Sequence, residues 1–377
     1  MKIAIVHDYI KEFGGAERVL EEFLNIFPSA EIYTSVYLPK YLGPHKNRFK
    51  SYKIHTSVLQ YFPFKEKLIS PFRLLAPFVF MGMNLSSYDV ILVSQTGAYF
   101  PNLVQKGNAK IICYTHTPPR YLYGYMTARN WRNNRFKLIV GSVLNHFLRI
   151  FDFNSSKNVD QFIANSQEVA SRIKKFYRKD AIVVYPPVAT PLSTTLKPQK
   201  KQAKKDYYLT GGRLARAKGT DIIIKAFLKN KKPLKIFGKG FAGFEEELLN
   251  SARTEGGTLN IEFVGEVTDE EKLNLMKNAR ACIFSSFDED FGITPVEAMG
   301  QGTPVIAYRS GGVQETVIDR KTGVFYESNT PDALNSALLK FEKINISASS
   351  CITQAKKFMP SIFDSKIKTL IQKAVHS

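Results

Sequence analysis

Short apolar runs alternate with stretches of helical periodicity along most of this 377-residue chain. The clearest helix is predicted over Ala16–Phe27, where apolar residues recur at intervals of three and four. Such alternation favours parallel sheets covered by helices on both faces. The other elements predicted in the first half are strands at Lys2–His7, Glu31–Tyr37, Val90–Ser94, Ile111–Thr115 and Gln161–Asn165, and helices at Lys137–Arg149 and Gln167–Phe176.

A stretch rich in Pro, Ser, Thr and Lys then interrupts the alternation at Ala189–Asp206, and it is typical of an interdomain linker. A second doubly wound unit is predicted beyond it, followed by an amphipathic segment over Ala355–Ala374. Its strands are predicted at Tyr207–Thr210, Leu234–Phe237, Ile261–Val264, Ala281–Ser285 and Pro304–Tyr308, and its helices at Asp221–Leu228, Glu270–Asn278 and Pro295–Gly300.

The predicted organisation is therefore two α/β domains. An N-terminal domain spans 1–188, a linker 189–206 and a C-terminal domain 207–354, and the helix over 355–377 is expected to pack back toward the N-terminal domain. Two such sheets joined by a linker are expected to form a cleft, with ligands at the carboxyl ends of the strands.

The net charge of +20 indicates a negatively charged partner. Lys40–Arg73 holds eight basic residues and one acid, with seven Tyr and Phe residues among them. Basic and aromatic residues together suit an anionic membrane surface, although a solvated basic face is the simpler alternative. No nucleic-acid-binding signature is visible, and no apolar run is long enough to predict a membrane span. The three cysteines show no metal-ligand spacing, which indicates reduced thiols in the cytoplasm.

The strongest chemical motif runs from Phe287 to Ala298, between a strand and a helix. Thr294 is predicted as the N-cap of that helix and Pro295 as its first residue, which leaves free amides that favour an anion. Glu289 and Glu297 could accept hydrogen bonds from sugar hydroxyls. Glu297 could instead complete a capping box with Thr294, and Glu289 could be a solvated loop carboxylate. A metal-binding interpretation of the acids at 288–290 is not favoured.

A second motif, Gly211–Asp221, places Arg213 and Lys218 between a strand and a new helix. Arginine and lysine there would suit a diphosphate, although a basic surface loop is the alternative. Gly238, after the next strand, is a weak third candidate for close backbone approach to a ligand.

In the first half, Gly14 and Gly15 at the start of the first helix could admit a phosphate or an acceptor, although they form neither a Walker nor a dinucleotide-binding pattern. His116 and Arg120 follow the strand Ile111–Thr115, and Tyr9 follows the first strand. Residues at strand ends of a doubly wound sheet are expected to face the cleft, so His116 is a candidate for the reaction, and Arg120 and Tyr9 are candidates for the acceptor side.

Together these motifs resemble glycosyltransferase family 4, of the GT-B architecture with two Rossmann-like domains. The matching segments are Gly14–Val19, His116–Arg120, Ile163–Ser166, Val183–Val188, Gly211–Asp221, Phe263–Val267, Asp288–Val317 and Lys321–Tyr326. The variant with Asp290–Ile293 and His116–Arg120 is similar to bacterial mannosyltransferases that build O-antigen and other cell-surface polysaccharides.

The resemblance implies a role for each candidate residue. Glu297 would bind the ribose and Glu289 the transferred sugar, while Arg213 and Lys218 would hold the diphosphate. The amides of Phe291, Gly292 and Ile293, with neighbouring Thr294, would face the phosphate and sugar. Gly15 would lie by the phosphates and His116 by the sugar. Retention of configuration without a metal or other cofactor is also implied.

The expected function is transfer of a hexose, with mannose from GDP-mannose as the first choice, onto a polyprenyl-diphosphate-linked or glycan acceptor. The expected setting is the cytoplasmic face of the plasma membrane, with the protein bound peripherally. One alternative is a UDP-sugar-dependent transferase of the same family. The other, from a different class, is a non-catalytic module that binds a polyanion or a membrane.

Overall fold

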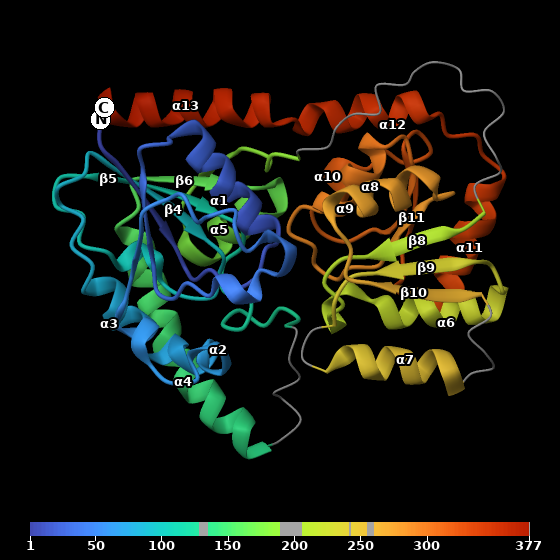
Figure 1. Cartoon of the computed structure of the whole chain (residues 1–377), viewed down its shortest axis with the longest axis horizontal. Coiled ribbons are helices and arrows are strands. Elements are labelled where there is room, and N and C mark those ends of the chain that lie inside the picture. The colour runs from blue at the N-terminus through green and yellow to red at the C-terminus, as the bar shows by residue number, and fades with distance from the viewer. Residues whose placement is uncertain (128–134, 189–205, 241–242, 255–259, 377) are drawn as a thin grey trace. The chain divides into compact units, whose positions relative to one another are not determined.

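The computed structural model describes residues 1–127, 135–188, 206–240, 243–254 and 260–376 (Figure 1). Its internal contacts divide the chain into two units. The first takes in Met1–Tyr125, the segment that ends at Pro187 and the C-terminal segment from Pro360, and the second runs mainly from Val188 to Met359. All but the last residue of the predicted linker lies outside the described residues.

The first unit contains a seven-stranded parallel sheet in the order β3-β2-β1-β4-β5-β6-β7. Its strands are β1 (Ile3–His7), β2 (Glu31–Thr34), β3 (Ile54–Thr56), β4 (Val90–Gln95), β5 (Lys110–Thr115), β6 (Gln161–Ala164) and β7 (Ala181–Val183). Its helices are α1 (Gly15–Ile26), α2 (Lys65–Leu68), α3 (Ala76–Met81), α4 (Arg135–Lys157), α5 (Gln167–Tyr177) and α13 (Pro360–His376).

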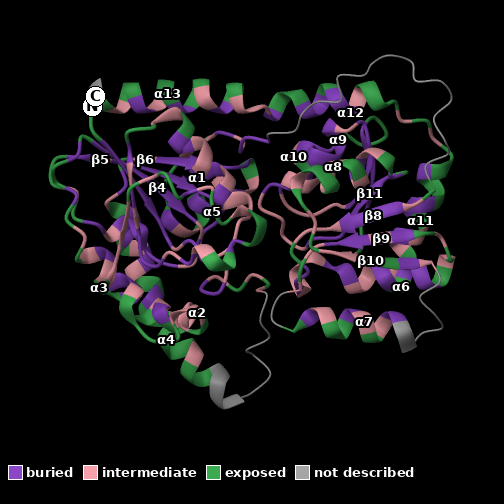
Figure 2. Cartoon of the chain, in the orientation of Figure 1, coloured by how far each residue is buried: buried purple, intermediate pink, exposed green. Residues whose placement is uncertain are grey.

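Both faces of this sheet are buried, as Figure 2 shows for β4, β5 and β6. Along β1, Ile3 and Ile5 enter one apolar cluster while Ala4 and Val6 enter another on the opposite face. A strand buried on both sides has no polar alternation, which is why the apolar runs of the sequence locate it well. The prediction missed β3 and β7, whose three residues each lie at the sheet edges and are only partly buried or exposed.

The second unit contains a six-stranded parallel sheet in the order β10-β9-β8-β11-β12-β13. Its strands are β8 (Tyr208–Gly211), β9 (Leu234–Phe237), β10 (Ile261–Gly265), β11 (Cys282–Phe284), β12 (Val305–Tyr308) and β13 (Gly323–Tyr326). Its helices are α6 (Thr220–Asn230), α7 (Phe244–Thr254), α8 (Asp269–Asn278), α9 (Ile293–Gly300), α10 (Val313–Thr316), α11 (Pro331–Glu342) and α12 (Ala348–Ala355). The two parallel sheets with their helices confirm the predicted α/β class.

The amphipathic segment predicted over Ala355–Ala374 is two elements rather than one. Met359, which precedes Pro360, adopts an extended ψ of 150°, because the proline ring disfavours a helical residue before it. The helix that begins at Pro360, α13, belongs to the first unit, where Phe363, Ile367 and Ile371 are buried beside α1. None of the described helices combines the length and the apolar character needed to span a membrane.

Where α13 meets α1, the carboxyl groups of Glu22 on α1 and Asp364 on α13 share a hydrogen bond. Burial and the neighbouring Asp364 raise the pKa of Glu22 to about 7. A raised carboxyl pKa means that the folded state binds the proton more tightly, so this contact is most stable below the ordinary glutamate pKa of about 4.3 and weakens as the pH rises through 7.

We therefore expect the amide protons of α13 to exchange faster at pH 8 than at pH 5.5, after correction for intrinsic exchange rates. Glu22→Gln preserves a hydrogen bond to Asp364 without titrating, so it should remove most of this pH dependence. Hydrogen exchange resolved to α13 provides the measurement. Burial also raises the pKa of Asp152 to about 7, but Asp152 lies on α4 and a local readout separates the two. An unchanged pH dependence in Glu22→Gln would show that Glu22 is not the group whose titration loosens α13.

Candidate active site

Two motifs of the second unit meet at one ion pair. Lys218 Nζ lies 2.6 Å from Glu289 Oε2, and the Glu289 side chain is only 12% exposed. The contact depends on how closely the start of α6 approaches the end of β11. The backbone N–H of Phe287 donates to the carbonyl of Ala217 at 2.8 Å, and a Cβ at Gly219 would lie 2.5 Å from the Ser285 carbonyl oxygen. Only glycine fits at 219, where φ is +64°.

The loop that carries Glu289 is fixed from its other side by the residues after β12. The amide of Gly312 donates to the Glu289 carbonyl at 2.8 Å, and the amide of Asp288 donates to Ser310 Oγ at 3.1 Å. A Cβ at Gly311 would lie 2.2 Å from the Glu289 carbonyl oxygen, at a φ of +69°. The Glu289 carboxylate is thus held in place by backbone contacts as well as by Lys218.

Helix α9 begins two residues earlier than the sequence predicted. Gly292, at φ +93°, is the N-cap and Ile293 the first helical residue, so Thr294 is not the cap and Pro295 is not at the first position. Glycine takes the cap because this left-handed conformation is strained for other residues. Phe291 is buried and packs its ring against Phe358. The amides at the start of α9 follow directly after the Glu289 loop, as the motif required.

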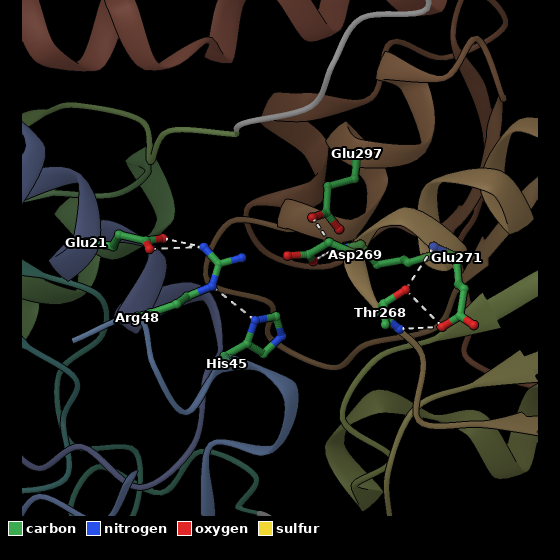
Figure 3. Close-up of polar contacts among 8 residues, drawn as sticks. Glu21, His45, Arg48, Thr268, Asp269, Glu271 and Glu297 are labelled. Carbon is green, nitrogen blue, oxygen red and sulfur yellow. Dashed lines mark hydrogen bonds and ion pairs between the residues drawn. The ribbon is translucent and has the colours of Figure 1, made fainter. Parts of the chain in front are cut away.

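Glu297 does not form the capping box with Thr294 that was the alternative to a binding role. Its Oε1 accepts a 2.6 Å hydrogen bond from Lys272 Nζ on α8, and Lys272 also contacts Asp269 Oδ1 at 3.1 Å. Figure 3 shows Glu297 and Asp269 around this contact. The Glu297 side chain is 8% exposed, so its charge is largely removed from water and Lys272 compensates it.

A capping box is present instead at the start of α8. Thr268 Oγ1 accepts from the Glu271 amide, and Glu271 Oε2 accepts from the Thr268 amide at 2.8 Å (Figure 3). The hydrogen bonds that Glu271 Oε2 accepts from the Thr268 amide and from the Thr268 hydroxyl lower the pKa of the Glu271 carboxyl. They fix where α8 begins, and Lys272 stands one residue further along that helix.

The remaining candidates of the second unit lie after β8 and β9. Arg213 is an exposed side chain of the loop between β8 and Lys218. Gly238, at φ +118°, approaches its own chain closely, since a Cβ there would lie 1.8 Å from the Gly212 carbonyl oxygen. The structure therefore brings Lys218 and Glu289 into contact, whereas Arg213 is exposed and Gly238 serves the packing of two loops.

In the first unit, His116 ends a buried chain of polar groups. Ser94 Oγ lies 2.9 Å from His116 Nε2 and 3.0 Å from His7 Nδ1, and His7 Nε2 lies 3.6 Å from a carboxylate oxygen of Glu17. The parallel register places His7 opposite Ser94. Burial, with a smaller contribution from His7, lowers the pKa of His116 to about 3, so its ring is neutral. The Ser94 hydroxyl can donate to one ring and accept from the other.

The other candidates of this unit are placed by α1 and the loops after β1 and β5. Gly14 is the N-cap of α1, and its amide already donates to Glu17 Oε2 at 2.9 Å, so a carboxylate lies where a phosphate was considered. Gly15 is the first helical residue. Tyr9 is partly buried with its ring 5.4 Å from that of Tyr99, and Arg120 is partly buried.

The cysteines take no part in this arrangement. All three are buried without a disulfide, and burial raises the pKa of Cys113 and of Cys282 to about 12. Neither thiol ionises near neutral pH, so both cysteines serve as small residues of the core.

Three residues that the sequence analysis did not single out contact candidate residues or their partners within one unit: Ser94 and His7 in the first unit, and Lys272 in the second. Ser94 and His7 stand at the ends of predicted strands, and the same rule that selected His116 would have found them. Lys272 gave no signal, because a lysine on a charged, polar helix is typical of a solvated face.

Comparison with known proteins agrees with the fold. Residues 13–190 match the family described as Glycosyltransferase Family 4, and residues 193–358 match Glycosyl transferases group 1. The alpha-1,3/1,6-mannosyltransferase ALG2 of Dictyostelium discoideum is 26% identical over 345 residues, covering 80% of this chain and 79% of that protein. The structure of HepE from Anabaena in complex with UDP has a TM-score of 0.70 at 18% identity, covering 99% of this chain and 100% of that one.

Two Rossmann-like units with these matches define a glycosyltransferase of the GT-B class. Within that class, the chain belongs to glycosyltransferase family 4. It is therefore a transferase enzyme, and the non-catalytic alternative is not retained.

Proposed function

We propose that the protein is a retaining mannosyltransferase that uses GDP-mannose and acts on a lipid-linked or glycan acceptor in cell-surface polysaccharide synthesis. Support for mannose comes from the ALG2 mannosyltransferases among its relatives, at 26% identity in three of them. The observation that carries the proposal is the contact of Lys218 with Glu289 beside the start of α9. It assembles a cation, a sugar-binding carboxylate and helix amides within one unit.

In this proposal Lys218 and the exposed Arg213 bind the diphosphate, and the amides of Phe291, Gly292 and Ile293 face its oxygens and the sugar. Glu289 accepts hydrogen bonds from sugar hydroxyls. Because Glu289 is paired with Lys218, arrival of a diphosphate would give the ammonium a second anionic partner and leave carboxylate capacity for the sugar. Glu297, orientated by Lys272, accepts from the ribose.

The chemical difficulty is the negative charge that builds on the departing diphosphate as the glycosidic bond breaks. Fixed cations and helix amides stabilise that charge. If the acceptor attacks from the face that the leaving group vacates, a leaving phosphate oxygen takes the acceptor proton and configuration is retained. No protein general base is then needed, which agrees with the neutral, low-pKa state of His116. We assign His116, and the Ser94 and His7 groups behind it, to positioning the sugar.

A UDP-sugar donor is the second candidate, because the solved structure of HepE, a protein of this fold, contains UDP. A panel of nucleotides and sugar nucleotides separates the two. GDP and GDP-mannose should raise the melting temperature of the purified protein most, and released nucleotide should identify the donor that is turned over. A response to UDP-sugars alone would overturn the GDP assignment and leave the family assignment intact.

The proposed acceptor is a polyprenyl-diphosphate-linked sugar at the cytoplasmic face of the membrane. The basic, aromatic segment Lys40–Arg73 suggested this setting, but part of it is structural. Phe49 and Phe72 are buried, and Arg48 pairs with both carboxylate oxygens of Glu21 and with His45 (Figure 3). The exposed rings of the segment are Tyr41, Tyr61, Phe62 and Phe64.

We further propose that turnover needs no metal. Of the acids at 288–290, Glu289 is paired with Lys218, which already supplies positive charge where a cation would act. Incubation with excess EDTA, followed by assay in metal-free buffer, should leave the rate of nucleotide release within about twofold of the untreated enzyme, since the stabilising charges are side chains and amides. A loss that added Mg²⁺ or Mn²⁺ restores would contradict this.

A further inference from the structure

Helix α4 is amphipathic, but it is orientated opposite to a normal surface helix. The side that faces the first unit is largely polar: Asp152, Ser155 and Ser156 are buried there beside Leu148, and Asp152 accepts from Tyr123 at 2.7 Å and Tyr177 at 3.1 Å. Nearer its start, Arg149 Nη1 donates to the Leu122 carbonyl at 3.3 Å. A surface helix ordinarily turns its apolar side inward, so this arrangement requires another explanation.

The apolar side of α4 is exposed to solvent. We call the following set the α4 stripe: Ile139 at 65% exposure, Val140 at 41%, Val143 at 53%, Leu144 at 39%, Phe147 at 57% and Ile150 at 48%. The spacing of three and four residues aligns these side chains along one face of the helix. Single exposed apolar residues are normal, whereas a continuous row of six marks an interaction surface. Figure 2 shows that exposed positions predominate along this part of α4.

The stripe continues onto neighbouring apolar residues of α3. The Phe151 ring of α4 lies 5.9 Å from that of Phe78, whose side chain is 62% exposed, and both helices pack on the turn Pro101–Leu103. Leu74 and Leu75, just before α3, are also exposed. The surface is therefore wider than one helix.

Charge indicates the kind of partner. Between residues 139 and 157 the only acid is Asp152, which is buried, while Arg149 and Lys157 are exposed. The segment from Lys67 to Tyr88 contains no acid at all. An apolar stripe bordered by cations without exposed carboxylates is complementary to a layer of anionic headgroups above acyl chains.

We propose that the α4 stripe, with Phe78, Leu74 and Leu75, inserts into the interfacial layer of an anionic bilayer. The helix lies in the plane of the membrane and does not cross it. This deepens the membrane part of the proposed function by naming the surface, and it moves the main contact from Lys40–Arg73 to α4. A second copy of the chain is the competing occupant, but two such stripes would bring like charges together.

The test uses the full chain and vesicles of phosphatidylcholine with phosphatidylglycerol in equal parts, or of phosphatidylcholine alone. The variant Val143→Ser with Phe147→Ser should lower the partition coefficient for the anionic vesicles at least about tenfold, because two inserted apolar side chains are lost. A matched pair at exposed apolar helix positions elsewhere, Leu339→Ser with Ile362→Ser, should bind as the unmodified protein does. Unchanged binding of the stripe variant overturns the proposal.

A second measurement reports on insertion itself. Phe147→Cys carrying an environment-sensitive fluorophore should shift to the blue on binding and be quenched by spin-labelled lipid, while Leu339→Cys should not; the native thiols are buried. Label at 147 that stays in water overturns the proposal, as does dimerisation without lipid that the stripe variant abolishes. Nucleotide release from GDP-mannose without vesicles should be the same in both pairs. If the protein uses GDP-mannose but does not bind vesicles, the donor assignment holds and the membrane proposal fails. If it binds vesicles through the α4 stripe but does not use GDP-mannose, the membrane proposal holds and the donor assignment fails.

Discussion

Replacement of Lys218 by alanine is expected to lower turnover at least about a hundredfold while the fold survives. Lys218 is the cation that the structure places 2.6 Å from Glu289, beside the start of α9. Loss of one preorganised group that stabilises charge on the leaving group typically raises the barrier by about 2.7–4 kcal/mol. We expect a loss of the same order for Arg213→Ala, because its guanidinium is proposed to bind the same diphosphate. The measurement is kcat for nucleotide release at saturating donor.

A matched control lies two residues away. Arg216 is in the same short turn as Lys218 but pairs with Glu247, so Arg216→Ala should leave turnover within about threefold. Lys218→Arg tests charge against geometry and should recover part of the rate. If Lys218→Ala kept nearly the full rate with an unchanged melting temperature, the diphosphate would have to bind elsewhere and the site assignment would be wrong.

The sheets were predictable because parallel strands buried on both faces are continuous apolar runs. Val90–Gln95 and Lys110–Thr115 are almost wholly buried, and no other element explains their composition. Ile54–Thr56 was not predicted as a strand because its three residues are only partly buried at a sheet edge, where composition carries little signal. Gly323–Tyr326 is buried and apolar, but it occurs within a segment that was interpreted only as a family motif.

The parts of the candidate site formed by local sequence motifs were predictable. The contact completed by a side chain distant in the sequence was not. Gly219 and Gly292 mark tight turns, and Lys218 and Glu289 follow strands whose carboxyl ends meet. The local capping rule for Thr294 and Glu297 failed because Gly292 takes the cap in a left-handed conformation. The side chain of Glu297 is then satisfied by Lys272, 25 residues away, which no local pattern reveals.

The second large effect is expected at that buried pair. Lys272→Met leaves the Glu297 carboxylate 8% exposed without its cation, and breaking a buried pair in this way typically costs about 3–5 kcal/mol. We expect the free energy of unfolding, measured with urea, to fall by about that amount. The KM for donor should also rise, because Glu297 is no longer held in the orientation proposed to bind the ribose.

The double variant Lys272→Met with Glu297→Gln separates folding from function. Removing both charges should restore most of the stability, to within about 1 kcal/mol of the unmodified protein, since no uncompensated charge stays buried. If Glu297 binds the ribose, the KM for donor of this double variant should stay about tenfold or more above normal, because a hydrogen bond to a charged group is lost. Glu297→Gln alone should raise the KM similarly at modest cost in stability, because Lys272 keeps its contact with Asp269. A double variant with both normal stability and normal KM would show that the pair only supports the fold, and the ribose would then need another partner in the second unit.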